Sequence, residues 1–204
     1  NVIDTKFKVK CTGKMELYGQ TFHCWKEKGH GWVSLKNAMK QSCDTYFYEV
    51  SRLLGVDRLN ITAEKFGLGK KVLGEYFDNE KKGLFPNTKW KKNNLGRGWV
   101  LGETLITGIG QGYIQSTPLQ LCMMTAQIAN GGYAIKPKII VDSNPISYED
   151  AKQSMESGLL FDSNSVSLLD KKLFKNQKNI KIVQESMFAS TNERFGTSYK
   201  SRID

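Results

Sequence analysis

The feature that most constrains the fold is a Ser-x-Asp triplet placed directly before an amphipathic helical pattern. Ser42 and Asp44 are followed by apolar residues at helical spacing, and Gly55 ends that pattern. The preceding residues 34–41 fit a short helix whose N-cap is Ser34. We therefore expect Ser42 and Asp44 on a turn between two buried helices, where a fold can hold polar side chains at a cleft. The simpler alternative is that Asp44 only caps the second helix.

Several glycine-rich motifs accompany this triplet in a fixed order. They are Gly29-His30-Gly31, Gly67-Leu68-Gly69, Gly108-Ile109-Gly110-Gln111-Gly112-Tyr113 and Ser116-Thr117-Pro118-Leu119-Gln120. The ordered set resembles the transpeptidase domain of class B penicillin-binding proteins, of the elongation type called penicillin-binding protein 2. The resemblance covers residues 7–142 and returns at 196–203.

This resemblance implies an α+β fold of the penicillin-binding transpeptidase, or serine β-lactamase-like, class. The chain would form mostly the helical half of that domain, with the antiparallel sheet largely outside it. The resemblance also implies a serine-type D,D-transpeptidase, an acyltransferase of peptidoglycan biosynthesis in cell-wall elongation and cell-shape maintenance. Its partners would be D-Ala-D-Ala stem peptides, β-lactams and membrane proteins of the elongation complex. Its place would be the periplasmic side of the bacterial inner membrane, with an anchor upstream of this chain.

Two of the three catalytic motifs of that family are absent from the sequence. Acyl transfer needs Ser-x-x-Lys for nucleophile and base, Ser-x-Asn or Ser-x-Asp for proton relay, and Lys-Thr-Gly for the substrate carboxylate. Only the middle motif occurs. We therefore expect residues 1–204 to be an internal segment of one transpeptidase domain, inactive by itself. The resemblance makes Ser42 the group that passes a proton to the leaving D-alanine amine, and Asp44 the group that orients a lysine or the turn.

Three of the four cysteines lie within 33 residues of one another, together with a histidine. In order they are Cys11, Cys24, His30 and Cys43, separated by twelve, five and twelve residues. Three sulfurs and one imidazole form the donor set of a closed tetrahedral zinc site. We expect a structural Zn²⁺ there. Because Cys43 is the middle residue of the triplet, the metal would fix the turn that carries the catalytic pair.

Other uses of the cysteines stay open at this point. A disulfide between Cys11 and Cys24 suits an oxidising compartment, and buried free thiols would be packing alone. His23 is an alternative fourth ligand, although glycines flank His30 on both sides and would let its imidazole approach a metal. Cys122 lies apart in an apolar helical pattern, and we expect it to pack in the core.

The charge of the chain is strongly basic, with 30 Lys and Arg against 20 Asp and Glu and a net charge of +10. The lysines form short scattered runs without interleaved aromatic residues, so we expect solvated surfaces and no nucleic-acid partner. A basic surface also suits work beside an anionic membrane or an acidic wall polymer. No run of 18 apolar residues occurs, so we expect no membrane span and no signal peptide in this sequence.

The other expected elements follow from local signals along the chain. The stretch 108–112 lacks both the GxGxxG spacing and the Lys-Ser/Thr of a phosphate loop. Thr117, Pro118 and Gln120 fit the N-cap, first residue and capping-box partner of a buried apolar helix. The remaining expectations are one strand and a loop over 1–32, a helix over 56–66 capped by Asp57, a surface loop over 68–104, a strand over 133–141, polar helices and loops over 143–180, and a helix around 182–188.

Two functions from other classes remain as alternatives. The first is a non-catalytic, zinc-stabilised interaction module, which the missing motifs favour. The second is a penicillin-sensing or β-lactamase-like relative. A segment that lacks its sheet should also leave apolar faces exposed near Tyr46 and Leu121.

Overall fold

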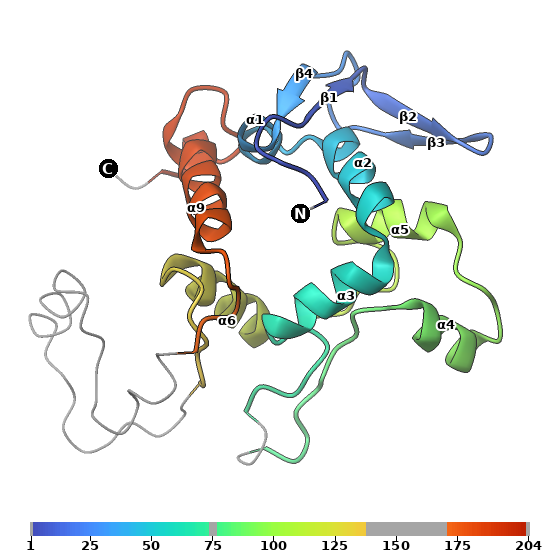
Figure 1. The fold of residues 1–204 in the computed structure, drawn as a ribbon, viewed down its shortest axis with the longest axis vertical. Helices are drawn as coiled ribbons and strands as arrows, with labels where there is room; N and C mark the ends of the chain where they lie inside the picture. Colours follow the sequence, from blue (N-terminus) through green and yellow to red (C-terminus); the bar gives the residue numbers. More distant parts are fainter. Residues whose placement is uncertain (1, 74–76, 138–170, 203–204) are drawn as a thin grey trace, which may run out of the picture.

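The structure is a computed structural model that describes residues 2–73, 77–137 and 171–202 (Figure 1). Short strands at one end of the molecule precede a series of helices, and the late helix α9 lies beside the early helix α1. In chain order the elements are β1 (Lys8–Cys11), β2 (Lys14–Leu17), β3 (Gln20–His23), β4 (Gly31–Ser34), α1 (Leu35–Lys40), α2 (Asp44–Leu54), α3 (Val56–Lys65), α4 (Thr88–Leu95), α5 (Leu101–Gly108), α6 (Pro118–Ala129), α9 (Gln177–Asn192) and the 3-10 turn η2 (Tyr199–Ser201).

The strands form two separate antiparallel pairs, β1 with β4 and β2 with β3. Tyr18 and Gly19 connect β2 to β3 with φ angles of 49° and 76°, as a tight type I′ hairpin requires. β1 confirms the one strand expected over 1–32, but the loop expected for the rest of this stretch is wrong, because it holds β2, β3 and the start of β4. Each strand of the hairpin has only four residues. The alternation of polar and apolar residues in β2, where Met15 and Leu17 are half-buried, is too short to identify a strand by itself.

Helix α2 lies between two apolar clusters. Its residue Tyr46 is buried against the cysteines of β1 and of the loop after β3, whereas Tyr48 packs with Phe22 and Leu105. Tyr46 is 0% exposed, so the open apolar face expected near it is absent from the described part of the chain. The expectation holds for Leu121, which is 45% exposed.

Gly108 explains how α2 and α5 approach each other closely. A Cβ atom at this position would lie 1.7 Å from Oγ of Ser51 on α2. Only glycine fits there without displacing one of the helices. The start of the glycine-rich stretch at 108–112 thus serves packing between helices.

Two helix starts differ in detail from the prediction. Ser34 is the N-cap of α1, but its side chain makes no capping hydrogen bond. Helix α3 has Gly55 as N-cap, not Asp57. The Asp57 carboxylate instead accepts hydrogen bonds from the backbone and the hydroxyl of Thr88, which joins α3 to the start of α4.

The stretch 68–104 holds helix α4 and the start of α5, so the prediction of one long loop there is wrong. Helix α4 begins at Asn87, whose side chain accepts a 2.7 Å hydrogen bond from the Trp90 N–H. Its one buried residue is Lys91, which forms an ion pair with Glu103 of α5. A helix that buries a paired lysine has no apolar stripe, which is why the pattern did not reveal it.

Helix α6 begins as the capping signals predict. Thr117 Oγ1 accepts from the Gln120 N–H, and Gln120 Oε1 accepts from the Thr117 N–H. Its burial differs from the prediction, because Leu121 and Cys122 are exposed within the described structure. The buried side chains include the amides of Gln120 and Gln127, which donate to backbone carbonyls. Packing of Cys122 in the core is therefore wrong.

The last part of the chain is described only in part. Of the strand expected over 133–141, only a single bridge between Tyr133 and Lys172 is seen, and residues 138–141 lie outside the described ranges, as does most of 143–180. The helix expected around 182–188 is present as α9. Among the described residues, no helix combines the length and the apolar character needed to cross a membrane.

Candidate functional site

Ser42 lies on the turn between α1 and α2 in a strained backbone conformation. The Cys43 N–H donates to the Ala38 carbonyl at 2.8 Å, and the Ser42 N–H donates to the Met39 carbonyl at 3.3 Å. This is the Schellman pattern of helix ends, and it places Ser42 at φ 52°. Glycine normally occupies that position, so a serine there costs about 1 kcal/mol. Strain of this kind is found mainly at functional sites.

Asp44 is the first residue of α2, and Cys43 is the N-cap. The alternative that Asp44 caps this helix is therefore wrong. Its Oδ2 instead accepts a 3.0 Å hydrogen bond from the backbone N–H of Trp25. The indole Nε1–H of Trp25 also donates to the Gln41 carbonyl at 3.0 Å. One residue thus binds both ends of the turn, and the Asp44 charge lies favourably at a helix N-terminus.

Ser42 meets a residue from the far end of the chain. Its hydroxyl oxygen lies 2.9 Å from Oγ1 of Thr197, 155 positions later in the sequence. Neither Thr197 nor Trp25 was among the predicted site residues. In the sequence, only their positions pointed to these two residues. Thr197 belongs to the second stretch of the family resemblance, and Trp25 directly follows a predicted metal ligand.

Ser42 and Asp44 line a hollow of about 350 Å³. The rest of its wall consists of Met39, Phe47, Gly108 and Ile109. Among the lining residues that the structure describes, the two predicted catalytic residues are the ones with polar side chains. A hydroxyl in that setting can exchange a proton with a group that enters the hollow.

The four predicted metal ligands come together in the fold. One ligand atom from each of Cys11, Cys24, His30 and Cys43 lies within 4.8 Å of the others. His30 Nδ1 is 3.5 Å from Cys11 Sγ and 3.6 Å from Cys24 Sγ. In a tetrahedral site with Zn–S bonds of about 2.3 Å and Zn–N bonds of about 2.0–2.1 Å, the sulfur–nitrogen edge is about 3.5 Å. The donor types of the four side chains and the two sulfur–nitrogen distances thus fit zinc.

The sulfurs differ in their ionisation. Burial by itself would raise the pKa of Cys11, but hydrogen bonds with the Thr45 hydroxyl and with His30 lower this pKa to about 6. Burial is the main cause that raises the pKa of Cys43. The lowered pKa of Cys11 favours its thiolate, the form in which cysteine binds a metal. Cys11 and Cys24 are not joined by the alternative disulfide in this structure.

His30 occupies the fourth position of the cluster, whereas His23 is exposed and lies outside it. A Cβ atom at Gly29 would come within 2.2 Å of the Cys11 carbonyl oxygen. Glycine before His30 therefore lets the imidazole approach the sulfurs. Its other nitrogen, Nε2, is buried without a hydrogen-bond partner in the described part of the chain.

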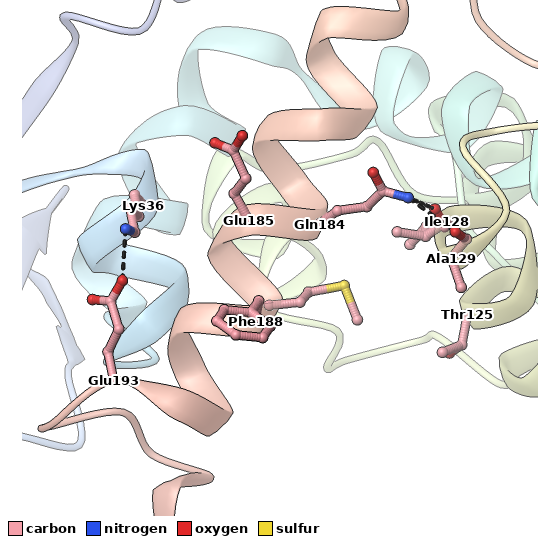
Figure 2. A pocket seen from close by; sticks show the side chains of 9 residues that line it. Lys36, Thr125, Ile128, Ala129, Gln184, Glu185, Phe188 and Glu193 are labelled. Carbon is pink, nitrogen blue, oxygen red and sulfur yellow. Dashed lines mark hydrogen bonds and ion pairs between the residues drawn. The ribbon is translucent and has the colours of Figure 1, made fainter. Parts of the chain in front are cut away.

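A larger cavity of about 570 Å³ lies between α1, α6 and α9 and contains none of the predicted site residues. Figure 2 shows the contacts that cross it: Glu193, the C-cap of α9, pairs with Lys36 of α1, and Gln184 of α9 donates to the carbonyl of Ile128 on α6. Glu193 also pairs with Lys40 at 2.8 Å. These bonds attach α9 to its two neighbours and so fix the chain that leads on to Thr197.

Comparison with known proteins identifies the family to which the chain is similar. Residues 1–200 match the family model of the penicillin-binding protein transpeptidase domain. The peptidoglycan D,D-transpeptidase MrdA of Acinetobacter baumannii is 38% identical over 141 residues, which are 68% of this chain and 21% of that protein. The MrdA of Haemophilus influenzae is 39% identical over 119 residues, 58% of this chain and 18% of that protein.

Solved structures show the same fold. Penicillin-binding protein 2 of Pseudomonas aeruginosa, in complex with WCK 5153, matches with a TM-score of 0.79 at 34% identity, covering 98% of this chain and 42% of that one. The predicted α+β transpeptidase fold is thus confirmed. The chain spans about a fifth of the length of the curated relatives it matches. It belongs to the penicillin-binding protein transpeptidase family.

Proposed function

We propose that this chain is part of a peptidoglycan D,D-transpeptidase of the elongation type, in which Ser42 and Asp44 form the second catalytic motif. The observation that carries the proposal is the pair itself: a strained serine and a bound aspartate are the polar groups of an apolar hollow. The relatives named above are D,D-transpeptidases. The nucleophile and the Lys-Thr-Gly motif would come from sequence outside these residues.

The two side chains would have different roles. In acylation, the nucleophile bonds to the carbonyl carbon of the substrate, and the terminal D-alanine leaves as an amine that takes up a proton. Ser42 Oγ would deliver this proton and receive another from the nucleophile's base. The Asp44 carboxylate, bound to the Trp25 N–H, would hold the turn in place.

The substrates and partners follow the same proposal. They are D-Ala-D-Ala stem peptides and, as inhibitors, β-lactams. Membrane proteins of the elongation complex are proposed as partners, because a relative from Helicobacter pylori, 27% identical with a TM-score of 0.79 over 98% of this chain and 33% of that one, was solved in complex with MreC. The enzyme would act at the periplasmic side of the inner membrane, held by an anchor outside these residues.

We also propose that Zn²⁺ binds to Cys11, Cys24, His30 and Cys43 as a structural ion. The support is the fit of the sulfur–nitrogen distances to a tetrahedral site. The ion would supply a fixed link between β1, the start of β4 and the N-cap of α2. Since that N-cap is the residue between the two catalytic side chains, the link would stiffen the turn.

Labelling with a fluorescent penicillin tests the enzymatic proposal. The intact enzyme that contains this segment should be labelled stoichiometrically, and Ser42→Ala should slow labelling by about 100-fold, as loss of a general acid–base group does. Ser116→Ala, at an exposed serine, is the matched control and should label at the normal rate. The 204-residue chain alone should not be labelled.

The same experiment separates the alternatives. A β-lactamase-like relative would hydrolyse the penicillin repeatedly, and a sensor would be labelled but would not crosslink stem peptides. No labelling of the intact protein would favour the zinc-stabilised interaction module and would reject the enzymatic proposal.

A further inference from the structure

We propose that Thr197 is a positioning residue for Ser42. Its hydroxyl is the hydrogen-bond partner that holds the catalytic Ser42 hydroxyl in place. This inference rests on the proposed function of Ser42. It starts from the 2.9 Å contact between the two hydroxyl oxygens. Within the described chain, this is the hydrogen bond that the Ser42 side chain makes.

The position of Thr197 is fixed independently of its side chain. Its backbone N–H donates to the Lys40 carbonyl at 3.0 Å. Lys40 is the last residue of α1, two positions before Ser42. The backbone of Thr197 is therefore bound to the same turn that its hydroxyl contacts.

The segment that carries Thr197 is also anchored on its N-terminal side. Helix α9 ends five residues before Thr197, and Glu193 at its C-cap pairs with Lys36 and Lys40 at 2.7 and 2.8 Å. Earlier in this helix, Gln184 donates to carbonyls of α6 (Figure 2). The Lys40 side chain is only 14% exposed, so its pairing lies in a partly desolvated contact.

A hydroxyl partner suits a proton relay better than a fixed donor or acceptor. Thr197 can donate to Ser42 Oγ, which leaves the Ser42 proton free for the hollow. It can also accept from Ser42 while its own proton turns to Ser190 Oγ, 3.3 Å away, or to the Lys40 carbonyl, 3.5 Å away. Ser42 can thus release one proton and receive one while its oxygen stays in place, and the number of protons is conserved.

The test compares Thr197→Val with Thr197→Ser in the intact enzyme. Valine has nearly the shape of threonine without the hydroxyl, and both variants keep the backbone bond to Lys40. With a fluorescent penicillin, Thr197→Val should lower the first-order acylation constant about fivefold, the size of one hydrogen bond. The dissociation constant of the non-covalent complex should not change. Thr197→Ser should restore the wild-type rate.

Two controls keep the result interpretable. Thr62→Val, at an exposed threonine of α3, should leave both constants unchanged. In a Ser42→Ala background, Thr197→Val should have no further effect on acylation if it acts through Ser42. Equal rates for wild type and Thr197→Val, failure of Thr197→Ser to rescue, or an undiminished effect without Ser42 would each overturn the inference. If the wild-type enzyme takes up no penicillin at all, the proposed function itself is wrong.

Discussion

The backbone N–H of Trp25 donates a 3.0 Å hydrogen bond to Oδ2 of Asp44. Each of these residues directly follows a cysteine of the proposed zinc site, Cys24 and Cys43. The Trp25 ring also lies edge-on to His30, with 5.5 Å between ring centroids. The same two chain segments therefore build the metal cluster and the catalytic turn. A substitution in one of these two sites should change the structure of the other.

The hydrogen bond to Asp44 predicts different effects of two substitutions. Asp44→Ala removes the acceptor of the Trp25 N–H and should lower the free energy of unfolding by about 1.5 kcal/mol. Asp44→Asn keeps an acceptor oxygen and should cost less than half of that. Urea unfolding of the two variants measures the difference. Equal losses would show that the charge, and not the hydrogen bond, supports the turn.

The cysteine cluster predicts zinc-dependent stability. The chain purified without chelator should hold one zinc ion, measured by mass spectrometry, and chelation should lower its melting temperature. Cys43→Ser should lose the metal and the chelator effect, because it removes a buried ligand. Cys122→Ser changes an exposed cysteine outside the cluster and is the matched control. Full melting stability with no bound metal would contradict the proposal.

Much of the fold was predictable from residues with strong local signals. The capping box of Thr117 and Gln120 and the stop at Gly55 depend on neighbours in sequence, so the sequence reveals them directly. Helix α4 and the β2–β3 hairpin were missed because their stability comes from tertiary contacts. One such tertiary contact is the ion pair of Lys91 with Glu103, which a polar sequence pattern does not predict.

The candidate site likewise combines residues that the sequence predicts with a contact that it does not predict. Spacing and donor chemistry grouped the three cysteines with His30, and the structure brings these residues together. The contact of Ser42 with Thr197 joins residues 155 positions apart and depends on how α9 packs against α1. No local pattern encodes such a contact, so only the three-dimensional structure reveals it.

The strained turn predicts that Ser42→Gly does not destabilise the protein. Glycine adopts a φ of 52° without steric cost, so the substitution should relieve about 1 kcal/mol of strain. The loss of the hydrogen bond to Thr197 offsets part of this gain in the free energy of unfolding. Thermal unfolding should show a melting temperature equal to or above that of the wild type. Penicillin labelling of the intact enzyme should nevertheless fall to the level of Ser42→Ala. A large loss of stability would show that the serine hydroxyl is itself structural.

The contact between α2 and α5 predicts a compensating pair of substitutions. Gly108→Ala should cost about 2 kcal/mol or more, since its Cβ would overlap the Ser51 side chain. Ser51→Gly removes that side chain and should cost about 1 kcal/mol in a helix. If the clash is the cause, the double variant should be more stable than the sum of the two single losses predicts. Additive losses in a denaturation experiment would rule out this explanation.

The pairing of Glu193 predicts how stability depends on pH. Hydrogen bonds and ion pairs with Lys36 and Lys40 lower the pKa of Glu193 from its usual 4.5 to about 2. Because the folded pKa is the lower one, the contribution of these pairs is complete above pH 4.5 and is lost as the pH falls toward 2. The difference in unfolding free energy between wild type and Glu193→Gln should therefore shrink across this window. Glu185→Gln, on the same helix, controls for the loss of one negative charge. A difference that stays constant from about pH 6 down to about pH 2.5 would mean that the link between α9 and α1 does not depend on the Glu193 charge.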